Sequence, residues 1–159
     1  MAAIKRRDAR EEVFRLLFET EFHGEMSPEE IYRLAMEDRD FEDNRYIRET
    51  YFGVREKREE LDGVIARHAN GWRTDRIAPV SRNILRLCVY EMKWGHDVPV
   101  VVALNEAIEL DKKFDDPKAK AFVNGVLNGV KNELEAGKTE PAESAGTAAP
   151  DGNGEGAAE

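Results

Sequence analysis

Apolar residues recur along most of the chain at intervals of three and four positions, the spacing that places them on one side of an α-helix. Over residues 8–23, two neighbouring stripes comprise Ala9, Val13, Leu16, Leu17, Phe14, Phe18 and Phe22. His23 and Gly24 then supply a typical stop signal. The pattern predicts a first helix over residues 8–23.

The motif SPEE, residues 27–30, predicts the start of a second helix. Ser27 is a favoured N-cap residue, Pro28 fits the first helical position, and Glu30 can complete a capping box. These residues therefore mark a helix start on local chemistry alone.

A longer apolar stripe extends from Asn44 to Ala69 and predicts one helix, interrupted on its apolar side by Arg58. Asn70 and Gly71 follow it. Both residue types tolerate the left-handed backbone conformation that often ends a helix.

The second half of the chain contains the most apolar segments. The segment between Ser81 and Gly95 is apolar on nearly all sides, which predicts a central, buried helix. The run VPVVVAL, residues 98–104, has the β-branched composition of a strand, but the sequence offers no second strand to pair with it. Because helical spacing continues beyond it, we expect a helix over residues 98–114.

Asp116 and Pro117 are expected to cap a last helix, which contains two glycines, Gly125 and Gly129. A glycine inside a helix costs about 1 kcal/mol relative to alanine. We therefore expect both glycines to permit the close approach of a neighbouring helix.

The composition changes after Leu134, where alanine, glycine, glutamate, proline, serine and threonine predominate. Such a segment buries too little apolar surface to offset the entropy of ordering it. The sequence predicts an all-α domain of six to seven helices over residues 1–134 and a disordered acidic tail over residues 135–159.

The formal net charge is -9, but the segment from Glu133 onward holds seven acidic residues and one lysine, which leaves -3 for residues 1–132. The single cysteine, Cys88, excludes an internal disulfide and suits a reducing cytosol. No apolar run approaches the roughly 18 residues of a membrane span. We therefore expect a cytoplasmic protein.

A basic cluster stands at the start of this acidic chain: Lys5, Arg6, Arg7 and Arg10. On a helix, Arg6 and Arg10 share one face, and guanidinium groups donate two parallel hydrogen bonds to phosphate. Phe18 lies two turns further on and would offer a stacking plane for a base if it faced outward. These residues are candidates for RNA binding; the alternative is a solvated basic terminus.

Five stretches, in their order and spacing, resemble the NusB family: RRDAREEVFRLLF, YFGV, RNILRLCVYEM, VPVVVALNEAIELDKKF and KAFVNGVLNGV. The resemblance covers about residues 5–132. It implies an all-helical fold of two packed three-helix subdomains and a non-enzymatic role in transcription antitermination. It also implies binding of the boxA element of ribosomal RNA operon transcripts, jointly with the ribosomal protein NusE, within an RNA polymerase complex.

The resemblance also implies where RNA binds. The arginine-rich start of the family maps onto Arg6, Arg7 and Arg10. Asp8 stands where many relatives carry another basic residue; this departure would either weaken the affinity for RNA or shift the contact onto Lys5.

The segment DKKFDDPKAKAF, residues 111–122, is a second basic candidate. A helix N-terminus attracts anions, although the two aspartates beside it would already occupy that positive end. Ordinary surface lysines are the alternative. In the family this junction lies beside the RNA surface, so Lys112, Lys113 and Phe122 are secondary candidates; Phe122 is equally compatible with the core.

Nothing in the sequence supports catalysis or metal binding. Glu106 and Glu109 have no histidine or further carboxylate at the spacing of a di-metal site. We expect Asn105 and Glu106 to cap or tie helices. Phosphate loops, zinc spacings and catalytic triads are absent from the sequence, and we expect no cofactor. Two alternatives stay open: an accessory domain of an RNA methyltransferase, and a homodimer that buries the arginines in its own interface.

Overall fold

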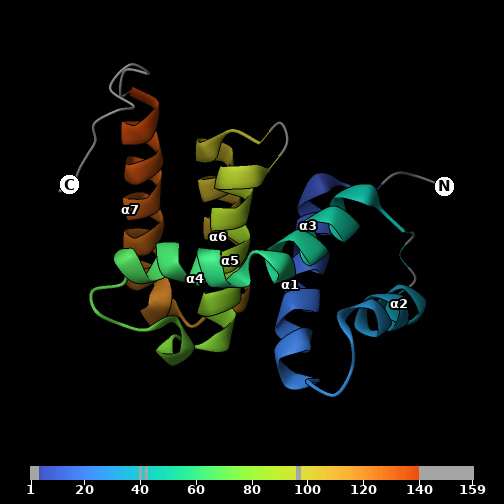
Figure 1. The fold of residues 1–159 in the computed structure, drawn as a ribbon. Helices are drawn as coiled ribbons and strands as arrows, with labels where there is room; N and C mark the ends of the chain where they lie inside the picture. Colours follow the sequence, from blue (N-terminus) through green and yellow to red (C-terminus); the bar gives the residue numbers. More distant parts are fainter. Residues whose placement is uncertain (1–3, 40, 42, 96–97, 140–159) are drawn as a thin grey trace.

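Seven α-helices and two short 3-10 helices make up the computed structural model, which describes residues 4–39, 41, 43–95 and 98–139 (Figure 1). The elements in chain order are α1 (Arg6–Phe22), α2 (Pro28–Arg39), α3 (Arg45–Glu56), α4 (Arg58–Arg67), η1 (Thr74–Arg76), α5 (Pro79–Trp94), α6 (Val100–Phe114), η2 (Pro117–Ala119) and α7 (Lys120–Thr139). The described part of the chain contains no strand; the segment VPVVVAL is helical from Val100 onward, and the predicted all-α class is confirmed.

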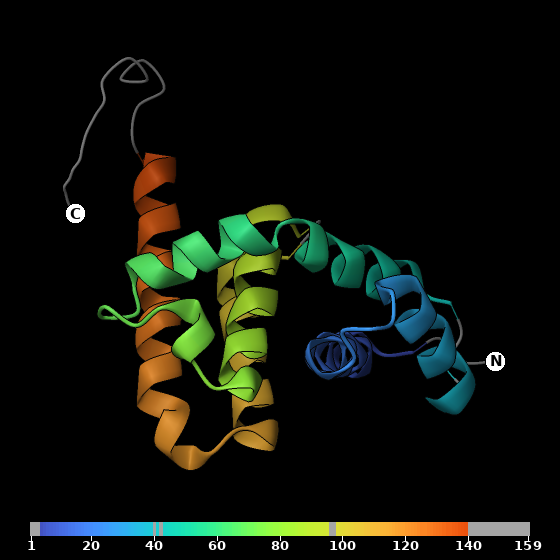
Figure 2. The same ribbon diagram turned by 60° about the horizontal axis from the view of Figure 1, so that its bottom comes forward.

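The helices form two groups that share α5 (Figures 1 and 2). α1, α2 and α3 pack together on one side, and α5, α6 and α7 stand side by side on the other, with α4 laid across α5 and α7. α5 contacts α1, α3, α4, α6 and α7. The predicted central helix is confirmed: α5 contacts five of the other helices, while α2 packs on α1.

Local capping chemistry fixes the start of α2 as predicted. Ser27 Oγ accepts a hydrogen bond from the backbone N–H of Glu30 at 3.1 Å, and the Glu30 carboxylate accepts one from the Ser27 N–H at 3.2 Å. This reciprocal pair is a complete capping box. Asn70 and Gly71 both adopt positive φ angles, 52° and 85°, as expected for the left-handed turn after α4.

The single helix predicted over residues 44–69 is wrong, because the chain bends at Lys57 (φ -95°, ψ 14°). The bend separates two packing surfaces: α3 buries Tyr51 and Val54 against α1 and α5, while α4 buries Leu61 and Ile65 against α5 and α7. Figure 2 shows α3 and α4 following one another around the core. Each half therefore turns its own apolar side inward.

Buried ion pairs join α1 to α5. The Glu21 carboxylate accepts hydrogen bonds from Arg82, Asn83 and Arg86, and Arg86 also donates to Asp62 of α4 at 2.7 and 2.9 Å. Burial would raise the pKa of Glu21, but these donors and positive charges lower it on balance. The network fixes the C-terminal end of α1 against the start of α5.

The two glycines of α7 differ. A Cβ atom on Gly129 would lie 2.5 Å from Nδ1 of His68, so this glycine permits the close approach of α4. A Cβ on Gly125 would meet nothing within 4 Å. The packing explanation is confirmed for Gly129 and wrong for Gly125, which faces solvent.

We expect Gly125→Ala to raise the free energy of unfolding by about 0.5–1 kcal/mol, because alanine favours the helix and finds open space. Gly129→Ala is the matched change; it forces the His68 ring away from Glu133, whose carboxylate lies 2.7 Å from His68 Nε2. We expect it to lower the free energy of unfolding by about 1 kcal/mol. Urea denaturation of both variants checks this; equal effects would contradict the packing role of Gly129.

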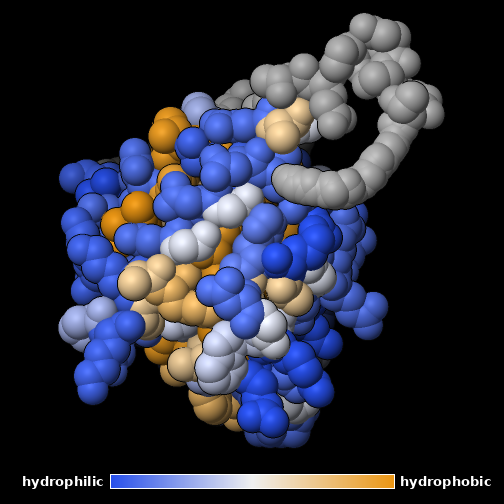
Figure 3. Space-filling model, turned by 90° about the vertical axis from the view of Figure 1, so that its left-hand side faces the viewer, coloured by the Kyte–Doolittle hydropathy of each residue, from blue (hydrophilic) through white to orange (hydrophobic). Residues whose placement is uncertain are grey.

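α7 continues to Thr139, five residues beyond the boundary expected at Leu134, so residues 135–139 are helical rather than part of a tail. The rest of the expected acidic tail, residues 140–159, lies outside the described residues. The face that α7 presents is mostly hydrophilic, with apolar side chains in the gaps between charged ones (Figure 3).

Candidate nucleic-acid interface

The basic cluster occupies the first turns of α1. Lys5 is the N-cap residue, and both it and Arg6 are exposed, with no carboxylate partner among the residues that the structure describes. The Arg6 guanidinium lies over the ring of Tyr46, 4.1 Å from its centroid. The Arg10 guanidinium lies 5.7 Å from the same centroid, so Arg6 and Arg10 do share a face of α1.

Arg10, however, is only 4% exposed. It donates from Nε and Nη2 to the two carboxylate oxygens of Glu91, at 2.7 and 3.1 Å, and the Tyr46 hydroxyl donates to Glu91 at 2.7 Å. Burial lowers the pKa of Arg10, but Glu91 more than offsets this and the pKa is raised. The Arg10 side chain faces α5 with its donors engaged, which favours a structural role; its predicted RNA contact stays a prediction.

Arg7 differs from Arg10 in its exposure. It forms an equally well-aligned pair, donating from Nε and Nη2 to Glu106 at 3.0 and 2.9 Å, yet 61% of its side chain is exposed. The hydrogen bond from Arg7 lowers the pKa of Glu106. Exposed ion pairs contribute little to stability, so a phosphate can replace the carboxylate.

A groove of about 320 Å³ between α1 and α6 brings the two basic segments together; this α1–α6 groove is lined by Arg7, Arg10, Glu11, Glu106, Glu109, Leu110, Lys112 and Lys113. Lys113 Nζ lies 2.8 Å from Glu11, 102 positions earlier in the chain, and Lys112 Nζ lies 3.6 Å from Glu109. Both lysine side chains are more than half exposed. The residue pattern identified these cations separately, and only the family resemblance implied that the two segments lie beside one RNA surface.

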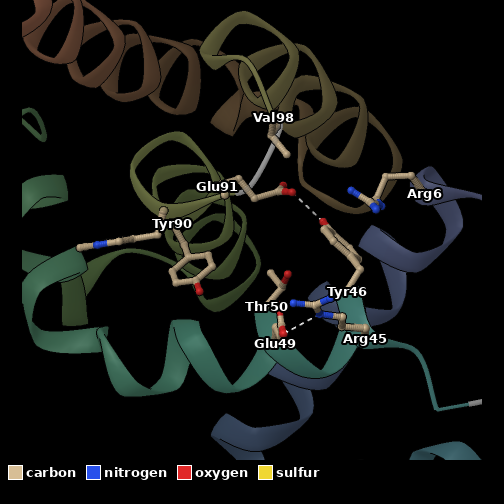
Figure 4. Close-up of a pocket in the computed structure, with 10 residues that line it drawn as sticks. Arg6, Arg45, Tyr46, Glu49, Thr50, Tyr90, Glu91 and Val98 are labelled. Carbon is tan, nitrogen blue, oxygen red and sulfur yellow. Dashed lines mark hydrogen bonds and ion pairs between the residues drawn. The ribbon is translucent and has the colours of Figure 1, made fainter.

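A second groove, of about 410 Å³, lies on the other side of the start of α1, between α3 and α5 (Figure 4). This α3–α5 groove is lined by Arg6, Arg45, Tyr46, Glu49, Thr50, Tyr90, Glu91, Trp94, Gly95 and Val98. Sequence reasoning missed Arg45 and Tyr46. The only available signal was an arginine beside an aromatic residue at a predicted helix start.

Phe18 does not lie beside the basic cluster. It is twelve residues after Arg6 on the same helix, which places it about 18 Å along the axis. Its half-buried ring packs between Phe14 and Phe22, with centroids 6.1 and 4.9 Å away. Phe18 is partly exposed at a separate groove, so its predicted base-stacking role stays a prediction.

Phe122, in the first turn of α7, is half-buried against the core. It does not line the α1–α6 groove. Its predicted RNA contact stays a prediction, and the structure is equally consistent with a packing role.

The helix start near Asp116 is occupied by the protein's own carboxylates. Asp116 accepts a hydrogen bond from the backbone N–H of Lys118 at 2.9 Å. Asp115 accepts from the N–H of Asp116 at 2.8 Å and from the Ser81 hydroxyl at 2.6 Å. A phosphate therefore has no open N-terminal site here, and only the lysine side chains remain available.

Asp111 directly precedes Lys112 and Lys113. Its side chain is buried, and its Oδ1 atom has no hydrogen-bond partner. Burial, and then the neighbouring Asp115, raise the pKa of Asp111 to about 7 from an ordinary value of 3.8. The folded protein thus holds a proton that the unfolded chain releases above about pH 4. Stability contributed by this proton is lost as the pH rises from about 4 to about 7.

We expect Asp111→Asn to remove this loss, because an amide stays neutral at every pH. Between pH 5 and pH 8, the free energy of unfolding of the variant should rise by about 2 kcal/mol relative to that of the wild type. Urea denaturation at both pH values measures the gain. An identical difference between variant and wild type at the two pH values would contradict the buried protonated carboxyl.

Other chemistry finds little support in the described residues. No three side chains of His, Cys, Asp or Glu gather there as a metal site would require. Within the same residues, every helix is too short or too polar to span a bilayer. Cys88 is buried, which raises the pKa of its thiol. The predicted tying role of Glu106 is confirmed, since it contacts both Arg7 and Arg10.

Comparisons with known proteins agree on one family. The NusB family model matches residues 7–132. The transcription antitermination protein NusB of Bacillus pumilus is 46% identical over 131 residues, covering 82% of this chain and 98% of that protein. NusB of T. maritima superposes with a TM-score of 0.76 at 31% identity, over 83% of this chain and 94% of that one. A structure of the antitermination factors NusB and NusE in complex with dsRNA gives a TM-score of 0.72 at 28% identity, covering 80% of this chain and 96% of that one.

Proposed function

The chain belongs to the NusB family, and on that premise we propose that it is a transcription antitermination factor without enzymatic activity. It binds boxA-type single-stranded RNA of ribosomal RNA operon transcripts, together with the ribosomal protein NusE, and joins the RNA polymerase antitermination complex. The solved relative in complex with NusE and dsRNA supports NusE and RNA as partners; the single-stranded form of the RNA is our proposal. Because transcription in bacteria takes place in the cytoplasm, the protein acts there.

The observation that carries the RNA site is the joining of two basic segments along one edge. Lys5 and Arg6 are unpaired within the described residues, and Arg7, Lys112 and Lys113 are held in exposed pairs around the α1–α6 groove. A polyanion gains these contacts and releases its counterions, which drives binding despite the chain's negative charge. We call these five residues the basic edge.

NusE needs a separate surface, and an apolar groove supplies one. Phe14, Phe18, Val80 and Phe114 line a groove of about 220 Å³ between α1, α5 and α6. Phe22, one turn after Phe18, is 57% exposed. Aromatic residues in an exposed groove are typical of protein interfaces, and we assign NusE to this one. Phe18 thus has a partner role in place of the base-stacking role expected from the sequence.

The two surfaces lie on different parts of α1, so RNA and NusE can bind together. A preassembled pair offers RNA a larger and better-ordered surface than either protein alone. The alternative is a homodimer whose interface covers the basic edge. Sizing the protein at several concentrations, with and without RNA, distinguishes that arrangement.

The function is tested by titrating a boxA-type oligonucleotide and a scrambled control into the protein, with and without NusE. We expect preference for the boxA-type strand, and tighter binding when NusE is present. Phe18→Ala should abolish the NusE effect while leaving RNA binding by the protein alone unchanged. Equal binding of both strands under all conditions would contradict the proposed function.

A further inference from the structure

We propose that the α3–α5 groove binds one further nucleotide of the same RNA strand, next to the segment on the basic edge. The inference deepens the proposed function and rests on it. This subsite lies on the opposite side of α1 from the α1–α6 groove, and Arg6 lies between the two grooves. The strand therefore wraps around the start of α1 rather than ending there.

Arg6 is the first part of this subsite. Its guanidinium carbon lies over the Tyr46 ring, 4.1 Å from the centroid. Among the described residues, no carboxylate pairs with it. The Tyr46 hydroxyl donates to the buried Glu91 carboxylate, which fixes the ring beneath the arginine. The outer face of a guanidinium held in this way is a stacking platform for a base.

The opposite wall of the groove is aromatic and rigid. Tyr90 and Trp94 lie one turn apart on α5, with ring centroids separated by 5.7 Å. Tyr90 lies directly against Gly53 of α3, where a Cβ atom would overlap its ring. Figure 4 shows Tyr90 on one side of the groove and Arg6 and Tyr46 on the other. The volume of about 410 Å³ falls in the range of small-ligand sites.

The groove lining contains two arginines and two carboxylates, and a phosphate would bind at the exposed arginine, Arg45. Arg45 projects from the start of α3 with 83% of its side chain exposed, and its partner is Glu49 of the same helix, at 2.8 Å. Lys57 and Lys93 each place Nζ about 5 Å from the Trp94 ring centroid, and Lys93 is also paired with Glu60 at 3.5 Å. An exposed pair one helical turn apart gives way readily to a phosphate. Base stacking on Arg6 and phosphate binding by Arg45 are therefore possible for one nucleotide.

The occupant is RNA because the groove continues the basic edge. Arg6 belongs to both, so a strand bound across Lys5, Arg6 and Arg7 has its next nucleotide at the mouth of the groove. A free nucleotide would lack that tether and would bind far more weakly.

The chain contains two tryptophans, which makes the test direct. Trp72 is 54% exposed, so Trp72→Phe leaves the fold intact and Trp94 as the single emitter. A labelled boxA-type oligonucleotide, and the same strand extended at each end, are each titrated with the Trp72→Phe protein. RNA anisotropy and Trp94 emission are recorded in the same titration. We expect the extension to quench Trp94 and to tighten binding about five- to tenfold, the gain typical of one stacked base.

Arg45→Gln should remove that gain, while Arg33→Gln should not, because Arg33 forms a comparable exposed pair with Glu37 on the distant helix α2. Binding seen by anisotropy, without Trp94 quenching or any gain from extension, would overturn the subsite and leave the proposed function standing. An absence of anisotropy change with either strand would instead overturn the proposed function and the subsite together.

Discussion

Replacement of Glu91 by alanine is expected to lower the free energy of unfolding by about 3–5 kcal/mol, because it leaves the Arg10 guanidinium buried without its partner. Glu91 is 2% exposed and receives three hydrogen bonds, two from Arg10 and one from Tyr46. It thereby connects α1, α3 and α5. Chemical denaturation of the variant and the wild type measures the loss.

Arg7→Ala is the matched control. Arg7 forms a two-pronged pair with Glu106 of similar geometry, but in an exposed position, so its loss should shift the unfolding midpoint little. The double variant Arg10→Met, Glu91→Leu should recover most of the stability, since it leaves no unpaired buried charge. A wild-type midpoint for Glu91→Ala would show that the buried network does not hold α1 in place.

The contrast between Arg7 and Arg10 shows what the sequence predicts well and what it does not. Helical spacing correctly placed Arg6 and Arg10 on one face of α1. The spacing could not show that Arg6, on this face, is exposed while Arg10, one turn later, is buried. Burial of Arg10 depends on Glu91, which lies 81 positions later in the chain.

The local sequence pattern predicted which segments are helical and which residues are buried. It did not predict where a helix bends or which neighbouring helix each side faces. The apolar stripe over residues 44–69 was real, but two packing surfaces divided it at Lys57. Likewise, Gly125 and Gly129 have the same neighbours in sequence, and only Gly129 faces another helix. Such differences depend on which helix lies opposite, and no single-sequence pattern records that.

The grooves were hidden for the same reason. Lys112 and Lys113 were secondary candidates through the family resemblance, and their place beside Arg7 follows from how α6 packs near α1. Phe18 was a candidate on its distance in turns from Arg10, and the length of α1 separates it from the basic edge. Residue type indicated the chemistry, and the fold decided which residues share a surface.

The double variant Arg6→Ala, Arg7→Ala is expected to weaken binding of boxA-type RNA by roughly 10- to 30-fold at about 0.1 M salt, since two phosphate contacts are lost. Its stability should stay close to that of the wild type, because both side chains are exposed. Arg33→Ala, Arg73→Ala changes the net charge equally at exposed pairs elsewhere and should leave RNA binding unchanged.

The salt dependence of RNA affinity tests the basic edge most directly. Five phosphate contacts on a single strand predict a slope of about -3.5 for log K against log salt, and loss of Arg6 and Arg7 should reduce it to about -2. The same slope and affinity for the wild type and the double variant would contradict the account, because RNA would then lie elsewhere on the molecule.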